Sequence, residues 1–138
     1  MMAIMCAECG GPIRPEDISA MKKTVLVAAC LVAGFTFAQA PSEPTRQEIA
    51  QLFGALKASD CRFYRNGSWH NAQKASAHLQ RKYDYLLKKG LVSSTETFIE
   101  LAASKSSMSG KPYQVRCGEA APVTSKHWFS ARLREIRK

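Results

Sequence analysis

The sequence has 138 residues, with 20 lysines and arginines against 11 aspartates and glutamates and a formal net charge of +9. Residues 1–40 contain three basic and three acidic residues, so the whole net charge belongs to residues 41–138. That segment is long enough for one small domain and excludes a multi-domain arrangement.

A secretory signal is the clearest feature of the N-terminal part. Two lysines follow Met21 and precede a mostly apolar run over residues 24–38. The run ends in an Ala-Gln-Ala cleavage site, so we predict a signal peptide over residues 21–40 that is cut between Ala40 and Pro41. The run is too short for a comfortable transmembrane span of ~20 residues. We therefore expect an exported protein whose mature domain is residues 41–138.

The residues before this signal do not fit it, because a signal peptide works at an N-terminus. We predict that residues 1–20 are a start-site artefact or a disordered extension. Cys6 and Cys9 form a C-x-x-C pair, but a structural zinc site normally needs two such pairs, and we expect no metal site. A lipoprotein anchored at Cys30 is an alternative. The apolar run continues past that cysteine, which favours cleavage after Ala40.

Cys61 and Cys117 are the two cysteines of residues 41–138. In an oxidising export compartment such a pair predicts a disulfide. A domain of this size buries only about 60–65% of its unfolded surface, so a cross-link would add needed stability. A redox-active pair is the alternative, but it normally has C-x-x-C spacing.

Capping residues and apolar spacing predict four helices in the mature domain. A capping box of Thr45 with Glu48 opens the first, and one of Ser93 with Glu96 opens the third. Asn71 is the expected cap of the second. The four predicted segments are residues 45–59, 71–89, 93–105 and 124–137.

Alternating patterns predict three strands, at residues 61–65, 68–70 and 112–117. Asn66-Gly67 separates the first two and is the strongest short hairpin signal. If the first and last strands pair antiparallel, Cys61 lies opposite Cys117, as a disulfide requires. We therefore predict an α+β fold, a small three-stranded antiparallel sheet with about four helices packed on it.

Three segments carry the candidate site. The hairpin contributes Arg65 and Asn66, and the second helix contributes His78 and Lys82, which share a face because they are four residues apart. The loop that follows the third helix contributes Ser104, Ser106, Ser107, Ser109, Gly110 and Lys111. Such a basic, hydroxyl-rich loop can bind an anion through its backbone N–H groups. The alternative is a connector whose hydroxyls satisfy its own backbone.

Several catalytic patterns fail in this chain. The loop is not a phosphate-binding P-loop, because Lys105 stands where its first glycine should be and Pro112 replaces the following Ser or Thr. The histidines lack metal-ligand spacing, and a triad drawn from His78 and a loop serine lacks an orienting acid. We predict no catalytic residue, no metal and no cofactor, and keep a small serine-type hydrolase as an alternative.

Four ordered motifs resemble those of a known family. They are FYRNGSWH at residues 63–70, AHLQRK at 77–82, TETFI at 95–99 and ASKSSMSGKPY at 103–113. They are similar to the YfeK-like family of small exported Gram-negative proteins, classed as a domain of unknown function. The resemblance implies a periplasmic, single-domain protein and implies no activity, substrate or catalytic residue.

These features together predict a non-catalytic binding or interaction module for an anionic envelope component or a periplasmic partner protein. A net charge of +9 is also typical of nucleic-acid binding, but an exported protein rarely meets nucleic acid. Solubility alone is a further explanation of the charge. A purely structural envelope protein, in which the motifs serve only the fold, is the remaining alternative.

Overall fold

The computed structural model describes residues 39–138. Within them lie the helices α2 (Glu43–Ala58), α3 (Ala72–Lys88), α4 (Thr95–Phe98), its π-helical continuation η2 (Ile99–Ala103) and α5 (Ser125–Ile136). The strands are β1 (Arg62–Arg65), β2 (Ser68–His70), β3 (Gln114–Arg116) and β4 (Val123–Thr124). The predicted signal peptide, apart from residues 39 and 40, and the sequence before it lie outside the described residues. So do Cys6, Cys9 and Cys30.

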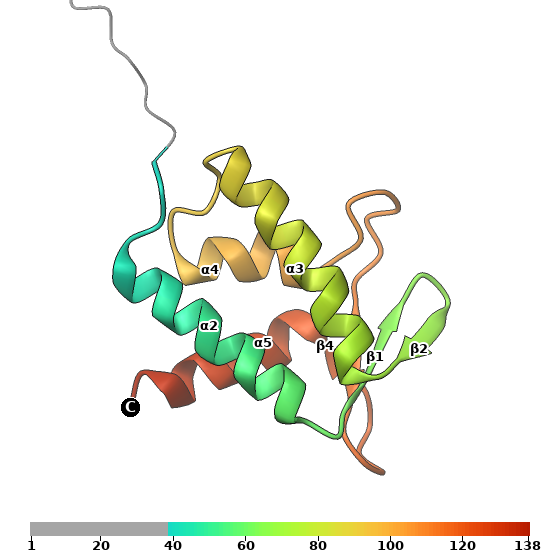
Figure 1. Ribbon diagram of the computed structural model, residues 1–138. Coiled ribbons are helices and arrows are strands. Elements are labelled where there is room, and N and C mark those ends of the chain that lie inside the picture. The colour runs from blue at the N-terminus through green and yellow to red at the C-terminus, as the bar shows by residue number, and fades with distance from the viewer. Residues whose placement is uncertain (1–38) are drawn as a thin grey trace, which may run out of the picture. The chain divides into compact units, whose positions relative to one another are not determined.

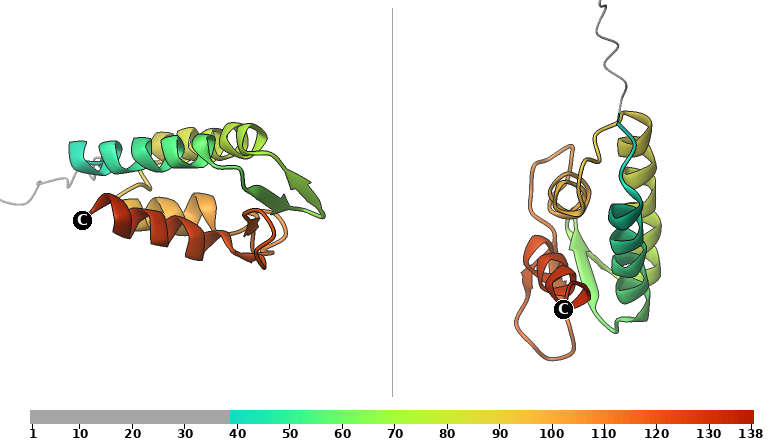
Figure 2. Two further views of the ribbon diagram at one scale, coloured as in Figure 1. Left: turned by 90° about the horizontal axis from the view of Figure 1, so that it is seen from below. Right: turned by 90° about the vertical axis from the view of Figure 1, so that its left-hand side faces the viewer.

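The helices form two layers, with the small sheet at one end of them (Figures 1 and 2). α2 and α3 pack side by side in one layer, and α4–η2 and α5 form the other. The predicted α+β class is confirmed. The helices pack mainly against one another, while α3 contacts β1 and α5 contacts β3 and β4.

The apolar side chains of α2 recur at helical spacing, and they are buried. Ile49, Leu52 and Leu56 are almost completely inaccessible, and Phe53 packs its ring 5.9 Å from that of Phe98 on α4. Phe98 is itself fully buried. The core therefore lies between the two helical layers, where the 3.6-residue periodicity of each helix directs its apolar side chains.

The first helix begins earlier than predicted. Ser42, not Thr45, is its N-cap, because the Ser42 hydroxyl accepts a hydrogen bond from the backbone N–H of Thr45. Pro44 fits the first turn, where a helix needs no backbone N–H donor. Glu48 consequently lies inside the helix and forms an ion pair with Arg137 instead of completing a capping box.

The third helix also starts at a different cap, since Ser94 rather than Ser93 accepts from the backbone N–H of Thr97. It changes from α-helical to the wider π-helical hydrogen bonding at Ile99. Ser104 ends it by donating its hydroxyl to the carbonyl of Ile99, at 2.7 Å. The predicted cap Asn71 is confirmed for α3, and Thr124 caps α5 by accepting from the backbone N–H of His127.

The antiparallel sheet has four strands in the order β2-β1-β3-β4, so the predicted number of three is wrong. The additional strand, β4, pairs with β3 through Val115 and Val123. Two residues are too few to show an alternating pattern in the sequence. The predicted hairpin is confirmed: Asn66 and Gly67 both have positive φ, 48° and 88°, as a type I′ turn requires.

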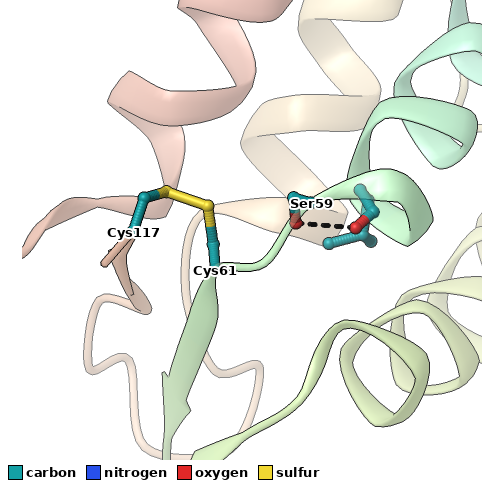
Figure 3. The surroundings of a disulfide bond; sticks show 4 residues. Ser59, Cys61 and Cys117 are labelled. Carbon is teal, nitrogen blue, oxygen red and sulfur yellow. Dashed lines mark hydrogen bonds between the residues drawn. A yellow bond between two sulfur atoms is a disulfide. The ribbon is translucent and has the colours of Figure 1, made fainter.

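The predicted disulfide joins Cys61 to Cys117 where β1 begins and β3 has ended (Figure 3). Their Cα atoms are 4.1 Å apart. β1 and β3 pair antiparallel with Arg62 opposite Arg116 and Phe63 opposite Val115, so the cysteines are the next pair of the same register. Among residues 39–138, no helix is long and apolar enough to span a membrane.

Reduction of this disulfide should lower the free energy of unfolding. The two cysteines are 56 residues apart, and on the chain-entropy model a loop of that length stabilises by about 4 kcal/mol. Urea unfolding with and without reductant measures the difference. A variant with both Cys61→Ser and Cys117→Ser should show the same loss and no response to reductant. Equal stability of the oxidised and reduced wild type would contradict this.

Candidate functional site

Arg65 projects from the core-facing side of the sheet toward α3. Side chains alternate along a strand, so Arg65 shares its face with the buried Phe63. Its guanidinium lies 2.8 Å from His78, measured from Nη1 to Nδ1. Arginine can only donate hydrogen bonds, so His78 accepts at Nδ1 and carries its proton on Nε2.

Tyr113 continues this chain of hydrogen bonds. Nε2 of His78 lies 3.2 Å from the Tyr113 hydroxyl oxygen and donates to it. Tyr64 pairs with Gln114, so the same register, continued by one residue, sets Arg65 opposite Tyr113. The Tyr113 hydroxyl hydrogen has no acceptor among residues 39–138 and can donate to a ligand.

Lys82 lies one helical turn beyond His78 and completes what we call the basic cluster: Arg65, His78, Lys82 and Tyr113. Its ammonium donates to the carbonyl of Lys105 at 2.9 Å and lies 5.1 Å from the centre of the Tyr113 ring. The helix spacing predicted that His78 and Lys82 share a face, and the cluster contains both.

Burial and like charges shift the pKa values of the cluster. Burial, followed by the positive charges of Arg65 and Lys82, lowers the pKa of His78 to about 4. Burial and then the charge of Arg65 lower the pKa of Lys82 to about 8. Burial raises the pKa of Tyr113, and Arg65 opposes that rise. At neutral pH His78 is therefore neutral, Arg65 is charged and Lys82 is mostly charged.

The basic cluster has no acidic partner in the part of the chain that the structure describes. The ion pairs formed there join Glu48 and Glu96 to Arg137, Glu100 to Lys126, and Arg132 to Glu135. None of them includes Arg65 or Lys82. The cluster therefore holds uncompensated positive charge on partly buried side chains.

A cavity of about 40 Å³ adjoins the cluster. Arg65, His78 and Tyr113 line it together with His70 and Lys74. Its remaining walls are Leu56, Phe63, Tyr64, Ala75, Leu79, Ala103, Ser125 and Phe129. His70, Lys74 and Tyr113 were not among the predicted site residues. Side chains alternate along a strand, so Tyr113 shares the core-facing side of the sheet with Val115. This alternation could have identified Tyr113 as a site residue from the sequence.

The serine-rich loop largely bonds to itself. The Ser106 hydroxyl accepts from the backbone N–H groups of Met108 and Ser109, each at 3.3 Å. The N–H groups of Gly110 and Lys111 donate to the Ser106 carbonyl and the Ser109 hydroxyl. These four N–H groups are occupied, so the loop matches the self-satisfied connector more closely than an anion cradle.

The remaining predicted residues lie around the cluster rather than in it. Asn66, Ser109 and Lys111 meet in a separate groove with Tyr64, Gly67 and Pro112. Ser107 lines a hollow on the Lys82 side of His78. Ser104, which ends η2, is buried. The three predicted segments thus approach one another. Arg65 of the hairpin and His78 of α3 share a hydrogen bond, and Lys82 reaches the loop through the carbonyl of Lys105.

His78 is not placed to activate a serine. Both ring nitrogens of His78 are engaged, by Arg65 and Tyr113, and neither contacts a serine. Residues 39–138 contain no group of three His, Cys, Asp or Glu side chains placed to hold a metal ion.

Comparison with known proteins places the chain among relatives. A family model described as a family of unknown function (DUF5329) matches residues 43–137. The uncharacterized protein YfeK of Salmonella typhimurium is 34% identical over 94 residues, which make up 67% of this chain and 77% of that protein. No solved structure gives a significant match. This chain therefore belongs to the DUF5329 family, and its predicted resemblance to the YfeK-like family is confirmed.

Proposed function

We propose that this protein is an exported, periplasmic binding module that holds an anionic ligand at the basic cluster and catalyses no reaction. One observation carries the proposal: Arg65 donates to a neutral imidazole instead of a carboxylate. A partly buried guanidinium without a counter-charge is costly. An anion bound there would offset that cost.

The cluster keeps enough donors for such a ligand. Arginine has five N–H donors in a planar fork, and the bond to His78 uses one of them. The Tyr113 hydroxyl and the Lys82 ammonium add further donors. An anion can therefore bind to Arg65 without breaking the chain of hydrogen bonds that orients it, and such charge-assisted bonds are the stronger kind.

Export is part of the proposal and rests on two independent features. The sequence of residues 21–40 has the order of a secretory signal. The Cys61–Cys117 disulfide favours the same compartment, because disulfides persist in oxidising environments. The ligand would then be an anionic component or partner of the cell envelope.

The two alternatives, a serine-type hydrolase and a purely structural protein, make different predictions. A serine hydrolase needs a serine within reach of His78, but both ring nitrogens of that residue are occupied by other groups. A purely structural protein would use the cluster for folding alone. A change in the cluster would then lower the stability of the protein without any loss of binding.

Arg65→Gln should weaken anion binding while Arg62→Gln should not. Both arginines lie on β1 and both changes remove one positive charge, but Arg62 is exposed on the opposite face. Loss of a charge-assisted hydrogen bond is worth about 1.5–3 kcal/mol, so we expect a Kd for acetate or phosphate about 10–100-fold higher in Arg65→Gln. Titration followed by NMR measures it, with thermal unfolding as a check of folding.

An equal, small loss of anion affinity in both variants would mean that the anions respond to net charge rather than to this site. That result would contradict the proposal. If Arg65→Gln proves unstable, Lys82→Gln tests the same cluster from α3.

Anion binding should weaken as the pH rises from 7 to 9. The pKa of Lys82 is about 8 instead of 10.5, so its positive charge is largely lost over this range. Arg65 remains charged, and His78, with a pKa of about 4, is neutral throughout. Acetate titrations at pH 7, 8 and 9 should therefore show a falling affinity, and Lys82→Gln should remove the slope. A pH-independent affinity in the wild type would contradict the role of Lys82.

A further inference from the structure

We infer that the ligand is a monocarboxylate with a short apolar group, which places its carboxylate at Arg65 and Tyr113 and its apolar group in the adjoining cavity. This inference rests on the proposed anion site and specifies its ligand. It follows from the walls of the cavity, which combine basic donors with a hydrocarbon lining.

The apolar walls come from all the main elements around the cavity. They are Leu56 of α2, Phe63 of β1, Ala75 and Leu79 of α3, Ala103 of η2 and Phe129 of α5. All of these except the half-buried Ala75 are core residues. The walls are therefore held by the packing of the domain, and the cavity exists before any ligand enters.

The size of the cavity limits the apolar group. One water needs roughly 10–15 Å³ of such space, so a cavity of about 40 Å³ holds about three water-sized groups. Waters against apolar walls find few hydrogen-bond partners and are readily displaced by hydrocarbon. A tail of about three carbon atoms fills this space without rearrangement of the core.

The polar side of the same cavity suits a carboxylate. Arg65 presents a fork that matches two carboxylate oxygens, and the free hydroxyl hydrogen of Tyr113 supplies a third donor. Lys74 and His70 lie on the same rim. Asn66, Ser109 and Lys111 line the separate groove at the hairpin tip, which lacks these apolar walls.

Two kinds of ligand combine a carboxylate with a short apolar group. One is a free short-chain acid, and the other is the C-terminal residue of a peptide with a small apolar side chain. Butyrate represents the first source. N-acetyl-alanine represents the second, with N-acetyl-glycine as the matched compound that lacks the methyl group.

The test is a titration of the wild-type protein with acetate, propionate, butyrate and hexanoate, followed by NMR. Each methylene buried in the cavity should tighten binding about fourfold. We therefore expect a gain of about 16-fold from acetate to butyrate, and a gain of less than about twofold from butyrate to hexanoate once the cavity is full. Tighter binding of N-acetyl-alanine than of N-acetyl-glycine would support the inference with a peptide as the source.

Ala75→Leu places a larger side chain in the cavity wall and should remove the dependence on chain length while acetate still binds. Ala77→Leu makes the same change at an exposed position of α3 and should leave the dependence intact. If thermal unfolding shows that Ala75→Leu is poorly folded, Ala75→Val tests the same wall with a smaller change.

The possible failures are distinguishable. Equal affinity for acetate and butyrate in the wild type would overturn the inference and leave the anion site intact. So would an unchanged chain-length dependence in a folded Ala75→Leu protein. Binding of none of the carboxylates and of no phosphate would overturn both the inference and the proposed function.

Discussion

The antiparallel register of β1 with β3 is the constraint on which the candidate site depends. Side chains alternate along a strand, so a slip of one residue would turn Arg65 away from the core. The Cys61–Cys117 disulfide fixes this register at one end. At the other end Arg65 lies opposite Tyr113, and His78 of α3 bonds to both. The cross-link between β1 and β3 thus also aligns the polar cluster of this small domain.

The electrostatics of the cluster follow from this alignment. Arginine cannot accept a hydrogen bond, so the imidazole between Arg65 and Tyr113 must stay neutral to hold them both. Burial and the neighbouring positive charges favour the same neutral form. The positive charges of the basic cluster therefore have no carboxylate partner in the described part of the chain. In the function we propose, this arrangement orients the donors before an anion binds, which reduces the entropy lost on binding.

Local signals predicted the parts of the fold that local physics determines. The buried face of α2, the Asn66-Gly67 turn and the disulfide followed from periodicity, positive φ and cysteine pairing. The helix starts predicted from capping boxes were wrong, because neighbouring serines and threonines can both serve as caps: Ser42 replaced Thr45 as the cap of α2. β4 consists of two residues, and its pairing with β3 depends on tertiary structure rather than on a sequence pattern.

The candidate site was predicted only in part, because its contacts also depend on tertiary structure. His78 and Lys82 share a helix face by spacing, but their contact with Arg65 and Tyr113 requires the packing of α3 on the sheet. The most direct test of the account is the tautomer of His78, read from its side-chain nitrogen-15 chemical shifts at pH 7. We predict a neutral ring that carries its proton on Nε2 and accepts at Nδ1. A ring protonated on Nδ1, or on both nitrogens, would contradict it.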